Sequence, residues 1–244
     1  MYSSSFDADH FAEINGTNLG FHLNDMLVGD YLFEQVVIKK EYLPKEITFT
    51  NLANIVDIGA NVGLFSCLMS AMFPDSKIFA FEPALSNIAR MQEHLALNKI
   101  ENVTLYPFAL GSTNENRELF LPHDEGAYSL FESNASLYTR GKGYTGKSYS
   151  VVVRNAREAL LESGIETIDF LKIDCEGAEL EILEAITPQL KNTKRIAIEW
   201  HPNVNIEFIE SILHQNSFRY FRKFERFKNG DPSLSMGTLF GSKA

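Results

Sequence analysis

Cysteine is scarce in this chain, and the spacings of cysteine and histidine that usually bind metals are missing. Only two cysteines occur among 244 residues, Cys67 and Cys175, and each lies within an apolar pattern. This usage is typical of buried thiols in a reducing compartment rather than of a disulfide. Because no C-x-x-C or H-x-x-x-H spacing is present, the local sequence does not indicate a zinc site.

Long hydrophobic runs and basic charge are also lacking. No run of about 18 apolar residues occurs, so no membrane span is predicted. The first ten residues, MYSSSFDADH, lack the basic and apolar parts of a signal peptide. The net charge of −10 disfavours nucleic acid and acidic membranes as partners. We therefore expect a cytoplasmic enzyme with a small-molecule substrate, and we leave open whether it forms a homodimer.

One stretch, residues 55–66 (IVDIGANVGLFS), has the pattern of a strand, a tight turn and a helix. Its glycines allow a ligand to approach the backbone closely, and Asp57 is expected to face that ligand. A dinucleotide fold requires G-x-G-x-x-G, and this spacing is absent, which disfavours an NAD(P)-dependent dehydrogenase. The D-x-G-x-x-x-G turn better suits a cationic nucleoside without phosphate, such as S-adenosylmethionine. The alternative is an ordinary strand–helix turn with incidental glycines.

Strand and helix patterns alternate from residue 51 onward. Strands are predicted at 54–58, 77–81, 103–106 (running on to 109–111), 169–173 and 195–198, with helices between them. Two final antiparallel strands are predicted at 220–227 and 234–240. The pattern predicts an α/β fold with a doubly wound, mostly parallel, seven-stranded Rossmann-like sheet, antiparallel C-terminal strands and a small β insertion at 112–154. Residues 1–50 are expected to form a lead-in or cap with a helix near 31–42, and residues 51–244 the catalytic domain.

Polar side chains end several of these strands. Because the carboxyl ends of parallel strands share one edge of a sheet, we expect the side chains to converge there. They are Asp57, Glu82, Asp174 with Glu176, and Glu199 with His201. The candidates for the acceptor pocket are Glu176 and three residues of the insertion, His123, Tyr128 and Ser129. An equally good interpretation of the three insertion residues is that they are ordinary loop residues.

The types of these residues suggest roles for them. Glu82 is expected to accept hydrogen bonds from ribose hydroxyls, although a surface acid near a helix start has the same pattern. Ala109 is expected to pack on adenine, and Asp174 to lie beside the sulfonium or the acceptor hydroxyl. His201, aligned by Glu199, is expected to take the hydroxyl proton, whereas a lone histidine is more often structural.

Two further expectations concern acids near these strand ends. Glu179 lies in the first turn of the next helix, where a surface acid stabilised by the helix dipole is an equally good reading. Three carboxylates and a histidine could bind Mg²⁺ or Zn²⁺. Since no local spacing supports this, a divalent metal is not favoured and no metal ligand is assigned.

Several motifs resemble the FkbM-type family of S-adenosylmethionine-dependent O-methyltransferases. The similar segments are VDIGANVGLFS (56–66), FAFEP (79–83), FALGS (108–112), DFLKIDCEGAELEIL (169–183) and IAIEWHP (196–202). The resemblance implies methylation of hydroxyls on sugars or natural-product intermediates, with S-adenosylhomocysteine as the product. Cys175 stands where a small aliphatic residue is more usual.

Nine residues are predicted to bind the cofactor and three to act in catalysis. The predicted cofactor-binding residues are Asp57, Gly59, Ala60, Asn61, Gly63, Glu82, Pro83, Ala109 and Asp174. The predicted catalytic residues are His201, Asp174 and Glu199. Asp174 belongs to both sets. The competing hypotheses are a nucleoside-binding protein without catalytic activity and, less favoured, a dehydrogenase.

Overall fold

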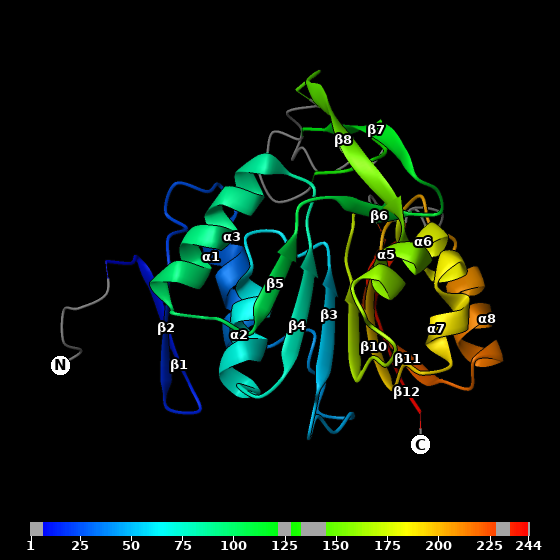
Figure 1. Cartoon of the computed structure of the whole chain (residues 1–244), viewed down its shortest axis with the longest axis horizontal. Coiled ribbons are helices and arrows are strands. Elements are labelled where there is room, and N and C mark those ends of the chain that lie inside the picture. The colour runs from blue at the N-terminus through cyan, green and yellow to red at the C-terminus, as the bar shows by residue number, and fades with distance from the viewer. Residues whose placement is uncertain (1–6, 122–127, 133–144, 228–234, 244) are drawn as a thin grey trace.

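The computed structural model describes residues 7–121, 128–132, 145–227 and 235–243. A seven-stranded sheet forms its centre, in the order β11-β12-β10-β9-β3-β4-β5 (Figure 1). The strands are β3 (Asn54–Ile58), β4 (Lys77–Phe81), β5 (Val103–Tyr106), β9 (Phe170–Ile173), β10 (Arg195–Trp200), β11 (Arg219–Phe227) and β12 (Ser235–Ser242). Strand β12 pairs antiparallel with both of its neighbours, whereas β5, β4, β3, β9 and β10 pair in parallel. The predicted fold class is confirmed.

Helices cover both faces of this sheet (Figure 1). They are α2 (Leu64–Met72), α3 (Leu85–Leu97), α5 (Ala156–Glu162), α6 (Glu179–Ala185), α7 (Thr187–Leu190) and α8 (Ile206–Gln215). Strand β3 shows how one segment serves two cores, because successive side chains point to opposite faces. Ile55 packs in the core of α2, whereas Val56 packs in the core of α5, α6 and α8. This burial on both faces explains why Ile55, Val56 and Ile58 are all apolar.

The lead-in is packed against the same sheet. It comprises β1 (His10–Ile14), β2 (Thr17–Phe21), α1 (Gly29–Leu32) and the π-helix η1 (Phe33–Ile38). Leu19, Phe21 and Val37 are buried in the core that α2 also contributes to. The helix predicted near 31–42 therefore lies at 29–38, and the chain turns at Lys40, whose φ is +53°. Among the described residues, no helix combines the length and apolar character that crossing a bilayer requires.

The insertion forms a second sheet over the carboxyl ends of the central strands (Figure 1). Its strands are β6 (Ala109–Gly111), β7 (Glu115–Phe120) and β8 (Ser148–Asn155), in the order β6-β8-β7. The prediction that strand 103–106 runs on to 109–111 is wrong, because these are two strands in different sheets. Pro107 has no N–H to donate, and the Phe108 N–H turns back to the carbonyl of Tyr106 at 3.0 Å. The chain consequently bends out of the central sheet.

A second boundary also differs from the prediction. The helix expected at 178–187 with a stop at Pro188 is divided into α6 and α7. Helix α6 ends at Ala185, and Pro188 lies in the first turn of α7. Proline is tolerated there because the first N–H groups of a helix have no partner within it.

Candidate active site

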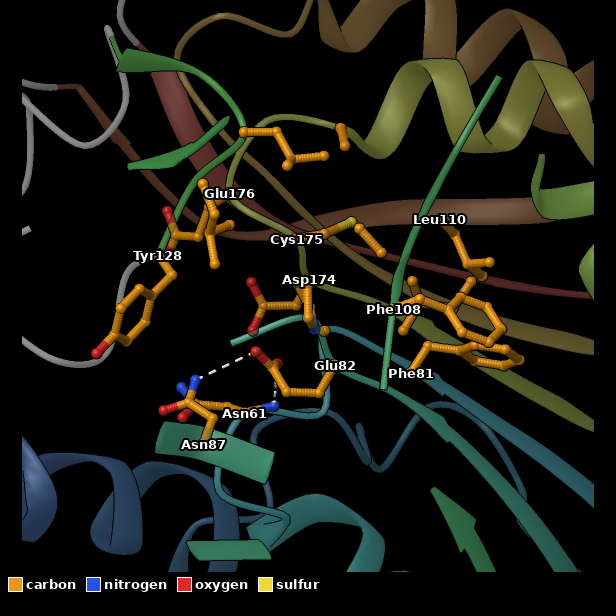
Figure 2. A pocket seen from close by; sticks show the side chains of 17 residues that line it. Asn61, Phe81, Glu82, Asn87, Phe108, Leu110, Tyr128, Asp174, Cys175 and Glu176 are labelled. Carbon is orange, nitrogen blue, oxygen red and sulfur yellow. Dashed lines mark hydrogen bonds between the residues drawn. The ribbon is translucent and has the colours of Figure 1, made fainter. Parts of the chain in front are cut away.

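A pocket opens at the carboxyl ends of β3, β4 and β9, below the second sheet (Figure 2). The space within it, including the part open to solvent, is about 590 Å³. The pocket lies beside β3, whose neighbours in the sheet are β4 on one side and β9 on the other. The chain runs from β3 to β4 and returns to the opposite side of β3 only at β9. Ligands in open α/β sheets bind where the strand order reverses in this way. Six of the nine predicted cofactor-binding residues line it: Gly59, Asn61, Glu82, Pro83, Ala109 and Asp174.

The turn after β3 requires glycine at two positions. Gly59 has φ of +75°, and a Cβ there would lie 1.7 Å from the carbonyl oxygen of Asp174. Gly63 has φ of +84°, and a Cβ there would lie 2.6 Å from Cγ of Met91. The glycines thus let the ends of β3 and β9 and the start of α2 come together. Ala60 and Gly63 shape this turn without lining the pocket.

Asp57 is wholly buried and does not line the pocket, contrary to the expectation that it faces a ligand. Its carboxylate accepts hydrogen bonds from Ser66 Oγ at 2.7 Å and Lys172 Nζ at 3.0 Å. Lys172 also donates to the carbonyl of Gly59 at 2.8 Å. Burial acts to lower the pKa of Lys172, but the carboxylates of Asp57 and Asp174 outweigh it and raise that pKa. The buried pair therefore supports the glycine turn from within the sheet.

Glu82 presents its carboxylate to the pocket and is held by several donors (Figure 2). It accepts hydrogen bonds from the backbone N–H of Asn61 at 2.8 Å and of Ala84 at 2.9 Å, and from Asn87 Nδ2 at 3.3 Å. Burial raises the pKa of Glu82 to about 7, although these donors act to lower it. Asn87, in the first turn of α3, was not predicted, because a polar residue there is also typical of an exposed helix face.

The other part of the pocket is apolar and aromatic. Phe81, Phe108 and Leu110 lie together at one side of it in Figure 2. Phe81 stacks on Tyr106 with ring centroids 4.7 Å apart. Ala109, which was predicted to pack on adenine, also lines the pocket. A flat aromatic base fits such a wall, while the polar groups of a nucleoside would face Glu82 and Asn61.

Asp174 stands between this pocket and a buried group of acids. Its carboxylate accepts from Tyr42 Oη at 2.9 Å, and the same hydroxyl lies 2.8 Å from Glu199. One hydroxyl hydrogen lies between two carboxyl groups, an arrangement that is favoured when one of them carries a proton. Burial, reinforced by the Asp174 carboxylate, raises the pKa of Glu199 to about 7 and favours Glu199 as its carrier. Sequence patterns did not reveal Tyr42, because it lies in the irregular lead-in.

His201 is 1% exposed, and both of its ring nitrogens face carboxylates. Nδ1 lies 2.7 Å from Glu179, whereas Nε2 lies 3.2 Å from Glu176 and 3.9 Å from Asp174. Burial acts to lower the pKa of His201, but Glu176 and Glu179 outweigh it and raise that pKa well above its usual value. A protonated imidazole has no lone pair to accept a proton. This geometry therefore does not support the expected role of His201 as general base.

The partner that aligns His201 is Glu179 rather than the predicted Glu199. Glu179 has no exposed surface, which contradicts its reading as a surface acid at a helix start. Its carboxylate also accepts from the backbone N–H of Gly177 at 2.9 Å and of Cys175 at 3.3 Å. The turn before α6 thus points the side chain inward, toward the end of β10. Local sequence could not show this orientation.

The remaining predicted residues lie around Glu176. Glu176 and Tyr128 line the pocket, and Glu176 has φ of +52°, which is uncommon for a side chain other than glycine. Burial raises the pKa of Glu176 to about 8, although His201 acts to lower it. Ser129 is buried and donates to the carbonyl of Glu176 at 2.6 Å. His123 lies outside the described residues.

One group of side chains in the described part of the chain has the composition and spacing of metal ligands. Asp174, Glu176 and His201 each offer one atom, and these atoms lie within 4.8 Å of one another. They come from the ends of β9 and β10, which explains why no local sequence spacing indicates them.

A comparison with protein-family models matches residues 57–220 to the methyltransferase FkbM domain. Methyltransferase sdnD of Sordaria araneosa is 32% identical over 215 residues, which cover 74% of this chain and 83% of that protein. The 2-O-methyltransferase NoeI of Sinorhizobium fredii is 24% identical over 192 residues, covering 74% and 78%. Among solved structures, the N-terminal domain of EvdMO1 with SAH bound superimposes with a TM-score of 0.51 and 11% identity, over 98% of this chain and 92% of that one. This last likeness concerns the fold alone.

Proposed function

Since the chain belongs to the FkbM family of methyltransferases, we propose that it transfers a methyl group from S-adenosylmethionine to a hydroxyl of a small molecule. The observation that carries the proposal is the convergence of Asn61, Glu82 and Asp174 in one pocket with an aromatic wall. Relatives support the same chemistry, because NoeI is described as a 2-O-methyltransferase. A sugar or a natural-product intermediate is the proposed acceptor class.

Three features of the pocket support the proposed cofactor. Glu82 is placed to accept from ribose hydroxyls, as acidic residues at the end of a second strand do in nucleoside-binding folds. Phe81 and Phe108 offer an apolar wall to adenine. Asp174 provides a carboxylate for a positively charged sulfur. When bound, S-adenosylmethionine supplies a methyl group that passes to the acceptor oxygen while the C–S electron pair remains on sulfur.

The protein's own contribution is alignment and removal of one proton. Aligning two bound reactants can contribute about 7–11 kcal/mol to lowering the barrier. Asp174 is the proposed acceptor of the hydroxyl proton, because its carboxylate lines the pocket and His201 is held by carboxylates on both nitrogens. A positioned base contributes about 10²–10⁴-fold in rate. Tyr42, whose hydroxyl also contacts Glu199, holds the Asp174 carboxylate in place from behind.

The test is methyl transfer from labelled S-adenosylmethionine to a panel of sugars and natural-product alcohols, with products identified by mass spectrometry. We expect a labelled O-methyl product from the unaltered chain. Asp174→Asn should lower turnover at saturating cofactor by about 10²-fold or more, and calorimetry should show weakened but measurable cofactor binding, because the carboxylate beside the sulfonium is removed as well. Cofactor binding without transfer to any acceptor, including those in a cell extract of the source organism, would instead identify a silent nucleoside-binding protein.

A further inference from the structure

We propose that Asp174, Glu176 and His201 form a binding site for one divalent transition-metal ion at the edge of the pocket. The inference goes beyond methyl transfer from S-adenosylmethionine, and metal binding can be tested without it. The group joins the turn after β9, which carries both carboxylates, to His201 at the end of β10.

The distances within the group suit a shared ion. Two ligand atoms about 2.1 Å from one ion stand about 3.0 Å apart at a right angle and at most about 4.2 Å apart when opposite. His201 Nε2 lies 3.2 Å from Glu176 Oε2 and 3.9 Å from Asp174 Oδ1. Both separations fall in that range, and all three ligand atoms lie within 4.8 Å of one another, so a modest movement of the two carboxylates brings the three side chains onto one ion.

Glu179 gives the imidazole the orientation that a metal ligand needs. It occupies Nδ1 at 2.7 Å, which directs Nε2 toward the two other carboxylates. A carboxylate on the far nitrogen of a metal-bound histidine is a recurrent arrangement that fixes the tautomer and strengthens the ligand. The buried position of Glu179, with no exposed surface, makes this orientation rigid.

A second histidine in the chain shows that carboxylate neighbours alone do not make such a site. His10 also contacts two acids, Asp9 at 2.5 Å and Asp30 at 2.7 Å. These acids face different ring nitrogens, so no single point is shared by all three side chains. At His201, by contrast, two carboxylates face the same nitrogen.

The surroundings hold more acidic than basic side chains. Four acids meet at this place, and they are Asp174, Glu176, Glu179 and Glu199. In the described part of the chain, the basic groups at this place are His201 itself and Lys172, which is 3.8 Å from Asp174 and is also paired with Asp57. A bound cation would compensate acids that are largely removed from water.

The ligand set indicates the kind of ion. Imidazole with two carboxylates suits Mn²⁺, Fe²⁺, Co²⁺ or Zn²⁺, whereas Ca²⁺ and Mg²⁺ prefer oxygen ligands alone. Asp174 and Glu176 line the pocket while His201 is buried behind them. Coordination positions not taken by protein would therefore face the pocket, where a substrate oxygen can reach them.

If the proposed methyl transfer is correct, the ion also defines the acceptor. A metal that binds a hydroxyl oxygen lowers its pKa and orients it. Two open positions on one ion favour an acceptor with two neighbouring oxygens, such as the vicinal diol of a sugar. This part of the inference rests on the proposed function, whereas metal binding itself does not.

The direct test is a titration of the chelator-treated full chain with Mn²⁺, followed by electron paramagnetic resonance in the absence of S-adenosylmethionine. We expect one ion per chain. Glu179→Gln should weaken binding about 10–100-fold, and Glu176→Gln at least as much, whereas the matched control His10→Asn should leave binding unchanged. Absence of stoichiometric binding, or equal binding by Glu176→Gln, would overturn the proposal.

A second measurement uses the unaltered protein and so does not depend on whether a variant folds. Anomalous diffraction from crystals soaked in Mn²⁺ should show an ion about 2.0–2.2 Å from His201 Nε2 and the carboxylate oxygens. An ion elsewhere, or none, would contradict the site. Because no methyl donor is present in either test, failure here leaves the proposed methyl transfer standing, and the reverse also holds.

Discussion

Glu82 combines burial in the pocket wall with a pKa near neutrality, and this makes cofactor affinity dependent on pH. Its pKa is raised to about 7, mainly by burial, while Lys172 acts to lower it. The Glu82 carboxylate in turn acts to raise the pKa of Tyr149. Below this pKa the carboxyl is neutral and attracts a cationic ligand less. The ionised form, which best accepts from ribose hydroxyls, predominates above it.

We therefore predict that affinity for S-adenosylmethionine rises between pH 6 and 8, by up to about tenfold for a group with a pKa of 7. Calorimetry at several pH values measures this. Glu82→Gln is isosteric and does not ionise, so its affinity should be weaker and nearly constant over the same range. A pH dependence that is equally steep in Glu82→Gln would exclude Glu82 as its source.

Lys172 belongs to a buried ion pair, so replacing it with an uncharged residue should destabilise the folded protein. Removing one partner of such a pair costs about 3–5 kcal/mol, because the other charge is left buried without compensation. We predict this loss for Lys172→Met in urea unfolding experiments. The matched control is Lys194→Met, since Lys194 pairs with Asp169 but is 64% exposed and should lose at most about 1 kcal/mol. Equal losses in the two variants would contradict the structural role of Lys172.

The turn between β3 and α2 decides at the element scale whether the pocket can form. Gly59 and Gly164 both have positive φ, +75° and +71°, but only Gly59 has atoms where a Cβ would lie. Gly164→Ala should cost about 1–2 kcal/mol for its left-handed backbone. Gly59→Ala should in addition displace the end of β9 and abolish cofactor binding. Thermal unfolding and calorimetry on both variants test this, and normal binding by Gly59→Ala would contradict the described turn.

Much of the element pattern could be predicted from the sequence, for reasons visible in particular strands. The strands at 54–58, 77–81 and 103–106 lie at the predicted positions, because strands buried on both faces are short apolar runs bounded by turn residues. The break after Tyr106 was missed, since the alternation of apolar residues continues across Pro107 into a different sheet. The side-chain directions of Asp57 and Glu179 were also missed, because they depend on which neighbouring element each packs against.

At the scale of the whole molecule, the site is assembled from segments far apart in the chain. Parallel strand topology was sufficient to predict that Glu82, Asp174 and His201 approach one another. It could not predict that Tyr42, from the lead-in, joins Asp174 to Glu199. Nor could it predict that His201 turns one nitrogen toward Glu179 and the other toward two further acids. These contacts depend on tertiary packing that leaves no periodic pattern in sequence.

The lead-in is consequently proposed to be part of the catalytic unit rather than a removable cap. Leu19, Phe21 and Val37 are buried against the sheet, and Tyr42 contacts the acids of the site. We predict that a chain lacking residues 1–50 loses cooperative unfolding, because its α2 face is exposed to water. Circular dichroism during heating measures this. A truncated chain with the melting transition and cofactor affinity of the full chain would show that the lead-in is dispensable.

The central claim is that the groups at the ends of β3, β4 and β9 bind one molecule of S-adenosylmethionine in a productive orientation. A crystal structure of the full chain with S-adenosylhomocysteine tests it most directly. We expect the ribose hydroxyls to bind Glu82, adenine to pack against Phe81 and Phe108, and the sulfur to lie next to Asp174. A ligand bound elsewhere, or ribose and sulfur placed away from Glu82 and Asp174, would contradict it.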